Sequence, residues 1–503
     1  MSLMTRNLQT KRVLPILLIL IIYLSARLFG LGTDILNSDG ARWYRRSENF
    51  LQAIKTADFA STYQHYQPGV TLMWVNSVTR KAVWEAQDWL KTPRWSLENS
   101  QDFPKINAVS TTILVLILSV LFIYQMFVIS RITSVKVALI YGFFVSTEPY
   151  LIGIDRWFHL TSLESYLAFS AYLTYLYSLA NRTKLSTVAT GVLVALSALS
   201  KLTGIVVLPL ILLTEGVRTY YSRKFRRSFV SAAIIIVSFV VTSFILFPAL
   251  WVDFSSVMQK LSSAVVSAVN DDPRAQYFNP PFSYIYYLVI LVYKLSPVTL
   301  FYFVASLVLF IRQLRRKEPV QGKFVLAYLL TFFLVLTAST KKIDRYCLVF
   351  IQPLILFSSI YLSKLRNKTL VAVIVLQLLT SGFIYFKDFP ALSGYYSPIF
   401  GDAQTALNIG VYENSGEYFA QAAFYLNNKG RADVYMPDNY ESFKYFYRAN
   451  TLRDFSPSAK YVVTSVDFDR KTPRIINGCG KLDQSFGPKG SISYVYIYEC
   501  TSY

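Results

Sequence analysis

NSDGARWYRRSENFLQAIKTADFASTYQHYQPGVTLMW, from Asn37 to Trp74, is the stretch around which the rest of the chain is organised. It follows the first apolar segment directly, and it is polar, aromatic and charged. It is too long for a tight connection between two helices, and it places a carboxylate, Asp39, just beyond the edge of that apolar segment. Later apolar segments return to the same side three more times, each with charged or histidine side chains at the boundary. The pattern predicts a functional site at one membrane face, with Asp39 at its centre.

The composition is that of a membrane protein. Of the 503 residues, 53% are hydrophobic and only 16% are charged, which is too apolar for a soluble protein of this size. The net charge is +21, but the Lys and Arg residues fall in short clusters between apolar segments. We therefore expect a basic surface that faces anionic membrane lipids, and no nucleic-acid partner. No small-residue cleavage site follows the first apolar segment, so we expect that segment to be an anchor.

Because a bilayer core requires about 20 apolar residues per helix, the hydropathy pattern predicts about eleven transmembrane helices. The fifth and sixth are short and separated by Lys201, which favours a broken or partly inserted pair. The eleven lie near residues 13–31, 106–130, 136–152, 158–180, 185–200, 203–217, 229–249, 284–311, 323–339, 346–362 and 369–386.

The basic clusters set the expected orientation in the cell membrane. One precedes the first segment and five follow even-numbered segments, so all six fall on one side, which is cytoplasmic by the positive-inside rule. The N-terminus is then cytoplasmic and the C-terminus extracytoplasmic. The clusters are Arg6, Lys11 and Arg12; Arg131 and Lys136; Arg182 and Lys184; Arg218, Arg223, Lys224, Arg226 and Arg227; Arg312, Arg315, Arg316 and Lys317; and Lys364, Arg366 and Lys368.

Two domains are expected. Residues 1–386 form the transmembrane domain, which includes the first outer loop, residues 32–105. Residues 387–503 contain a helix-like run, SGEYFAQAAFYLNNKG, and the strand-like runs ADVYM, AKYVVTSV and SYVYIYEC, which predict a small extracytoplasmic α/β domain. Cys479 and Cys500 lie in this domain, and both a disulfide and two free thiols are consistent with their positions.

Several short motifs follow Asp39 in a fixed order. They are GVTLMW (residues 69–74), EPYLIGIDRWFH (148–159), LSALSKLTGIVVLPL around Lys201, FPALWVD (247–253) and KKIDRY (341–346). Their order and membrane placement resemble the GT-C superfamily of polyprenyl-phosphate-sugar-dependent glycosyltransferases. The resemblance is closest to the branch of protein O-mannosyltransferases and aminoarabinose transferases, including bacterial dolichyl-phosphate-mannose-protein mannosyltransferase-like proteins.

This resemblance implies a GT-C fold and an activity. The enzyme would move a sugar from a polyprenyl-phosphate donor to an acceptor hydroxyl at the outer face of the membrane, with inversion at the anomeric carbon. The acceptor would be a protein, a lipid or a glycan, as in protein glycosylation and cell-envelope synthesis.

The resemblance also assigns roles to charged residues. Asp39 is expected to be the catalytic base that removes the acceptor proton, although an Asp before a helix-like run is also typical of an N-cap. Arg156, Lys201 and Arg345 are expected to bind the donor phosphate. Contact with lipid headgroups or a local ion pair is the alternative for each of the three.

Seven further residues are expected to bind substrate or to support the site, and for Trp251 a membrane-interface anchor is the alternative. Two histidines and no Cys/His cluster predict no zinc site, while Mg²⁺ or Mn²⁺ bound by carboxylates stays open. The seven supporting residues are His65, Glu148, Asp155, His159, Trp251, Asp253 and Lys342.

The chain departs from the pattern of the superfamily at Gly40, Gln67 and Thr161, where relatives often carry Glu, His and Asp. These departures leave a non-catalytic protein of the same fold as an alternative. A lipid-linked sugar transporter is the second alternative. It predicts charges near the bilayer midplane and internal repeats, whereas here the charges cluster at one face.

Overall fold

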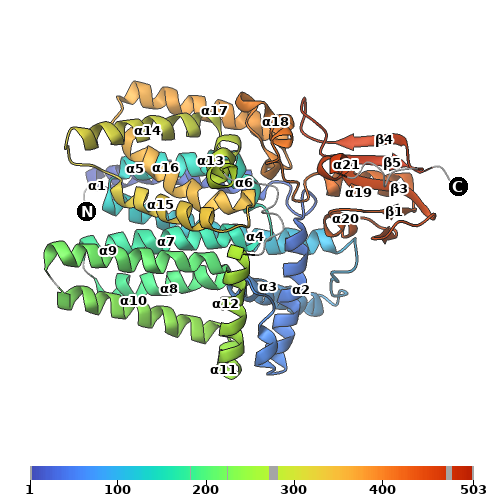
Figure 1. The fold of residues 1–503 in the computed structure, drawn as a ribbon, viewed down its shortest axis with the longest axis horizontal. Coiled ribbons are helices and arrows are strands. Elements are labelled where there is room, and N and C mark those ends of the chain that lie inside the picture. The colour runs from blue at the N-terminus through green and yellow to red at the C-terminus, as the bar shows by residue number, and fades with distance from the viewer. Residues whose placement is uncertain (1–2, 182, 224, 271–280, 472–477, 501–503) are drawn as a thin grey trace.

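The computed structural model describes residues 3–181, 183–223, 225–270, 281–471 and 478–500. A bundle of helices fills one end of the molecule and a small sheet with flanking helices forms the other (Figure 1). Arg182 and Lys224, from two of the basic clusters, lie outside the described residues.

The bundle contains several of the apolar helices that the sequence predicts. Among the described residues, six helical stretches are long and apolar enough to cross a membrane, and a bent pair makes a seventh. The six are α4 (Phe103–Ile132), η2 with α9 (Leu202–Val206 and Val207–Ser222), α10 (Phe225–Leu246), α14 (Pro297–Arg315), η4 with α16 (Asp344–Cys347 and Leu348–Leu362) and α17 (Asn367–Asp388). The polytopic helical fold class is therefore confirmed.

The remaining bundle helices are shorter or more polar. The helix at the centre, α7 (Leu160–Asn181), is buried along most of its length, because it packs against α4, α8 and α16. The others are α1 (Leu3–Leu28), α8 (Lys184–Ser200), α13 (Phe282–Lys294) and α15 (Lys323–Ala338).

Two predicted segments are interrupted. The segment predicted at 136–152 is the bent pair, α5 (Val135–Thr147) and α6 (Pro149–Asp155), which meet at 68° because Pro149 cannot continue α5. The prediction of one helix at 284–311 is wrong: α13 ends before Ser296, whose side chain caps α14 by accepting from Thr299 N, and Pro297 starts the new helix. The expected break at Lys201 is present between α8 and η2.

The first outer loop is largely helical. It contains α2 (Ser38–Lys55), η1 (Phe59–Thr62) and α3 (Val70–Trp89). Trp43 and Phe50 of α2 are buried, and α2 packs along α3, so the apolar face of this helix covers protein rather than lipid. The chain between α10 and α13 begins with α11 (Ala249–Val252) and α12 (Phe254–Asn270), which stand beside α2 and α3 in Figure 1. Residues 271–280 lie outside the described residues.

The C-terminal domain is α/β, as expected. Its strands are ordered β2–β1–β3–β5–β4, parallel over the first three and antiparallel over the last three. Cys479 and Cys500 form a disulfide. The elements are η5 (Leu392–Gly394), η6 (Pro398–Phe400), α18 (Asp402–Asn408), α19 (Phe419–Lys429), β1 (Asp433–Tyr435), α20 (Tyr440–Lys444), β2 (Thr451–Leu452), β3 (Ala459–Ser465), α21 (Val466–Lys471), β4 (Lys481–Phe486) and β5 (Val495–Glu499).

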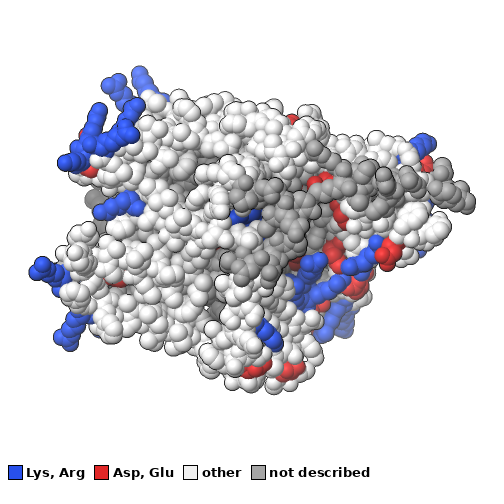
Figure 2. Space-filling model, in the orientation of Figure 1, with Lys and Arg blue, Asp and Glu red and all other residues white. Residues whose placement is uncertain are grey.

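The C-terminal domain docks on the first outer loop. Glu441 of α20 lies 3.6 Å from Arg45 of α2, and Lys444 lies 3.2 Å from Glu98. Lys and Arg side chains with few acidic neighbours project from the opposite end of the bundle, while acidic and basic side chains lie together near this domain (Figure 2). The end of the bundle away from the C-terminal domain is therefore the more purely basic one on this face.

Candidate active site

A cavity of about 160 Å³ opens where the first outer loop meets the ends of the bundle helices. Five Lys and Arg side chains and one carboxylate line it, so the cavity carries a positive charge and suits an anionic ligand. Its lining residues are Asp39, Arg42, Trp43, Arg46, His65, Tyr66, Gln67, His159, Leu160, Lys201, Lys341, Ile343, Arg345 and Tyr346.

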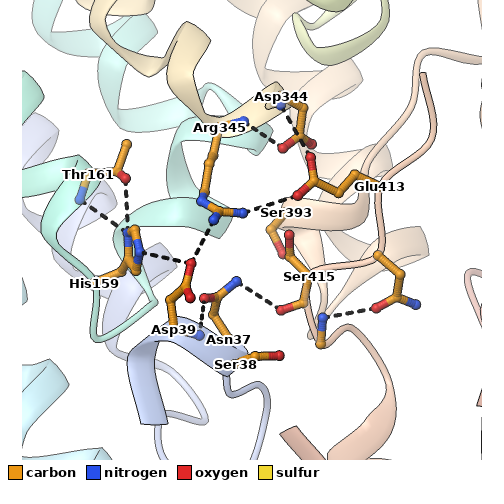
Figure 3. A network of polar contacts seen from close by, with 12 residues as sticks. Asn37, Ser38, Asp39, His159, Thr161, Asp344, Arg345, Ser393, Glu413 and Ser415 are labelled. Carbon is orange, nitrogen blue, oxygen red and sulfur yellow. Dashed lines mark hydrogen bonds and ion pairs between the residues drawn. The ribbon is translucent and has the colours of Figure 1, made fainter. Parts of the chain in front are cut away.

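Asp39 sits at the start of α2 but does not cap it. The cap is Asn37, whose side chain accepts a hydrogen bond from Asp39 N at 2.9 Å. The Asp39 carboxylate instead accepts from Arg345 Nη2 at 2.7 Å, and its Oδ2 lies 4.0 Å from His159 Nε2 (Figure 3). The structure thus removes the capping alternative that the sequence left open.

The surrounding charges keep Asp39 ionised. Burial alone would raise the pKa of this carboxyl, but the Arg345 and Arg42 guanidinium groups outweigh burial and hold its pKa below the usual value. Its side chain is 36% exposed, so an incoming hydroxyl has access to a carboxylate that is anionic at physiological pH.

His159, in the turn between α6 and α7, is held by Thr161. Thr161 N donates to His159 Nδ1 at 3.2 Å, and Thr161 Oγ1 lies 2.9 Å from the same atom. Since Nδ1 accepts, the hydrogen of the neutral ring is assigned to Nε2, on the side of Asp39. Burial and Arg345 lower the pKa of His159 to about 3. Thr161 is therefore the residue that fixes the tautomer of this ring.

His65 has a similar arrangement on the other side of the cavity. Its Nδ1 accepts from Gln67 N at 3.2 Å, and its ring packs on Tyr66 and against the edge of Trp43. Burial and Arg46 lower its pKa to about 4. Gln67 also accepts from Leu202 N at 3.1 Å, so the residue that departs from the superfamily pattern ties this loop to η2.

Lys201 and Arg345, the two other residues expected to bind the donor phosphate, both line the cavity. Lys201 Nζ lies 3.4 Å from Glu164 Oε2 and 3.6 Å from the ring centroid of Tyr346. Arg345 Nη1 donates to Glu413 at 3.2 Å. The Nε hydrogen of Arg345 is buried and has no hydrogen-bond partner among the described residues. The guanidinium therefore keeps a donor for a further anion.

Arg156 corrects the sequence-based interpretation, because it does not line the cavity. Its side chain is buried, pairs with Asp34 at 2.6 Å, and donates to the carbonyls of Arg27 and Phe29. Asp155 is likewise paired with Arg27 at 2.8 Å. These contacts hold the end of α1 against α6, so their roles are in packing this corner of the bundle.

Four other predicted supporting residues also lie outside the cavity lining. Glu148 accepts from Ser296 N at 2.7 Å and so holds the start of α14. Lys342 Nζ donates to carbonyls at the end of α15. Trp251 is 44% exposed and donates to the Phe244 carbonyl, which fits the anchor alternative. Asp253 is the residue at which α11 ends.

Sequence reasoning missed several residues of the site. Arg42 and Arg46 follow Asp39 at intervals of three and seven, which is one helix face, so their spacing was a usable signal. Glu164 interrupts an apolar run, as Lys201 does, and the pair was also recognisable. Glu413 gives no local signal, because only the docking of the C-terminal domain brings it to Arg345.

A divalent metal does not fit the groups around Asp39. Among the residues that the structure describes, no three His, Cys, Asp or Glu side chains gather in a way that could hold a metal ion. The Asp39 carboxylate accepts instead from the guanidinium groups of Arg345 and Arg42.

Known proteins resemble the chain only in structure. No protein-family model matches the sequence, and no curated protein does. ArnT from Cupriavidus metallidurans, solved with undecaprenyl phosphate bound, matches with a TM-score of 0.55 and 12% identity over 97% of each chain. The Archaeoglobus fulgidus oligosaccharyltransferase, solved with Zn and sulfate, matches with a TM-score of 0.50 and 13% identity over 97% of this chain and 73% of the other. The chain therefore shares the fold of these two proteins, as the fold class expected from the sequence implies.

Proposed function

We propose that the protein is an inverting glycosyltransferase that uses a polyprenyl-phosphate sugar and has Asp39 as its base. The observation that carries this proposal is the Asp39 carboxylate at 2.7 Å from Arg345, in a cavity otherwise lined by cations. A base and a phosphate-binding cation within one cavity are the two groups that such a transfer requires.

The donor would bind by its phosphate. Lys201 and Arg345 line the cavity, and Arg345 retains an unused Nε donor among the described contacts. In the reaction the donor phosphodiester becomes a phosphate monoester and gains one negative charge. Fixed cations in a partly dry cavity stabilise that charge more than water does. A lipid tail would lie along the apolar bundle, and ArnT of the same fold was solved with undecaprenyl phosphate.

The acceptor hydroxyl would enter beside Asp39. Its oxygen forms a bond to the anomeric carbon as the bond from that carbon to the phosphate oxygen breaks, and its proton passes to the Asp39 carboxylate. Direct displacement inverts the anomeric configuration. A mannosyl donor and an acceptor on a protein, lipid or glycan are the finer expectations from the resemblance.

The charge distribution supports an orientation. The end of the bundle with projecting Lys and Arg side chains would face the cytoplasm, which puts the cavity and the C-terminal domain outside (Figure 2). Residues 1–386 would then carry the donor site, while residues 387–503 would close it from the outer side.

The test uses wild-type protein in lipid nanodiscs with a panel of radiolabelled polyprenyl-phosphate sugars and an acceptor library. We expect transfer or slow hydrolysis of one donor, with inhibition by undecaprenyl phosphate. Binding of undecaprenyl phosphate without any turnover would favour a non-catalytic protein of this fold. No binding of any polyprenyl phosphate would contradict the proposal.

A further inference from the structure

Glu413 connects the C-terminal domain to the proposed catalytic centre. It lies between α18 and α19, and its Oε1 accepts from Arg345 Nη1 at 3.2 Å. Its Oε2 accepts from the backbone nitrogen of Asp344 at 3.4 Å. The Glu413 carboxylate therefore accepts hydrogen bonds from two successive residues of η4. One of them is Arg345, which contacts Asp39.

Glu413 is itself held in place from the opposite side. Its backbone nitrogen donates to Tyr396 Oη at 3.0 Å, and Lys294 Nζ lies 3.7 Å from the centroid of the Tyr396 ring. Lys294 also pairs with Asp344 at 3.2 Å. Contacts of this kind on both sides of η4 fix the distance between Glu413 and Arg345.

Arg345 is thus shared by two carboxylates from different parts of the chain. Nη2 donates to Asp39 of the first outer loop, and Nη1 donates to Glu413 of the C-terminal domain (Figure 3). A donor phosphate that binds Nη2 of Arg345 as well competes with Asp39 for that atom. Because Glu413 still accepts from Nη1, Nη2 can turn toward the phosphate while the guanidinium group remains in the cavity.

Gly40 explains why this second carboxylate comes from elsewhere. A Cβ at position 40 would sit 2.9 Å from the carbonyl oxygen of Phe158, so α2 has no room for an acidic side chain next to Asp39. The site still holds two carboxylates around Arg345, one on α2 and one on the C-terminal domain.

We propose that Glu413 is a positioning residue of the active site, which holds Arg345 for the donor phosphate through the docked C-terminal domain. This inference rests on the proposed function. When the phosphate takes Nη2, Asp39 loses the nearer of its two guanidinium partners while Arg42 stays at 3.5 Å, and it becomes a stronger base, so donor binding would prepare the carboxylate for the acceptor proton.

The test is a double-mutant cycle in nanodiscs with Glu413→Gln, Arg345→Gln and the double variant. We expect Glu413→Gln to lower kcat by tenfold or more, and to lower it no further in the Arg345→Gln background. If the fold-losses of kcat in the two single variants multiply in the double variant, the inference is overturned, because Glu413 then acts independently of Arg345.

Glu441→Gln is the matched control. Glu441 also carries a carboxylate from the C-terminal domain to an arginine of α2, Arg45 at 3.6 Å, but neither residue lines the cavity. We expect the kcat of the Glu441→Gln variant to stay within about twofold of the wild-type value. A loss equal to that of Glu413→Gln would overturn the inference and assign the effect to domain docking. If Glu413→Gln does not fold, Glu413→Asp takes its place in the cycle.

A second readout separates this inference from the proposed function. Affinity for undecaprenyl phosphate, measured by Trp fluorescence, is compared across the same cycle. If the wild type transfers no sugar but binds this lipid, the proposed function fails alone. The inference then stands if Glu413→Gln changes affinity threefold or more only when Arg345 is present. It is overturned if the change persists without Arg345, if there is no change, or if the wild type does not bind.

Discussion

The backbone of Gly40 approaches that of Phe158 so closely that a Cβ at position 40 would lie 2.9 Å from the Phe158 carbonyl oxygen. This contact presses the start of α2 against the turn that carries His159, and it brings Asp39 and His159 to one cavity. The glycine that departs from the superfamily pattern thus has a packing reason of its own.

Replacing Gly40 by Ala should therefore destabilise the protein. The added methyl group requires α2 or the turn to shift, and overpacking of this kind costs about 1–3 kcal/mol. Thermal unfolding in detergent measures the change. Gly382→Ala in α17 is the control, because a Cβ there meets nothing within 4 Å, and an unchanged or raised midpoint is expected. Equal midpoints for Gly40→Ala and wild type would show that the contact is not tight in solution.

Arg156→Gln should reduce stability without reducing donor affinity. Arg156 and Asp34 form a pair whose side chains are 0% and 3% exposed, and breaking such a pair costs about 3–5 kcal/mol because a charge stays buried without its partner. The unfolding midpoint and the affinity of folded protein for undecaprenyl phosphate are measured together. Lys444→Gln, which breaks the more exposed pair with Glu98, should cost under about 1 kcal/mol. Loss of affinity for undecaprenyl phosphate with an unchanged unfolding midpoint would instead indicate that Arg156 binds the phosphate.

The two histidines of the cavity should each make a contribution to stability that is lost as the pH is lowered from about 6.5 toward 4. The pKa values of both histidines are lowered in the folded state, to about 4 for His65 and to about 3 for His159. Unfolded imidazoles bind protons below about 6.5 while the folded ones stay neutral, so acid favours the unfolded state across this window. Unfolding midpoints across this pH range measure the slope. His65→Gln should flatten the pH dependence, and a slope equal to that of wild type would contradict the neutral folded state of His65.

The sequence predicted the fold because the fold class depends on local patterns, and the same kind of pattern gives the prediction for the centre of the site. Apolar segment length and basic clusters determined the helical architecture, and an interfacial charge such as Asp39 or Lys201 is recognisable without coordinates. Those local patterns do not show which side chains pair with one another in the folded protein. Arg156 was expected at the phosphate, yet its guanidinium is already held by Asp34 and two backbone carbonyls. Glu413 lies 68 positions from Arg345, and only tertiary docking of the C-terminal domain joins them.

The break at Ser296 shows the same limit on a smaller scale. An apolar run of 28 residues was interpreted as one helix, although Ser296-Pro297 within it is an N-terminal capping signal. Glu148 reinforces that break by accepting from both Ser296 N and Thr299 Oγ1. A charged residue that was expected at the substrate therefore shapes the bundle instead.

The central claim, that Asp39 is the base of a polyprenyl-phosphate-sugar transferase, is tested most directly by Asp39→Asn. Donor affinity and turnover are measured on the same nanodisc preparation, with Glu85→Gln on the exposed face of α3 as the control. We predict that the Asp39→Asn variant binds the donor at least as tightly as wild type, because the Asp39 carboxylate no longer competes for Nη2 of Arg345, while turnover falls by about 10²–10⁴-fold, the usual contribution of a positioned base. Turnover within about twofold of wild type would contradict the assignment of Asp39.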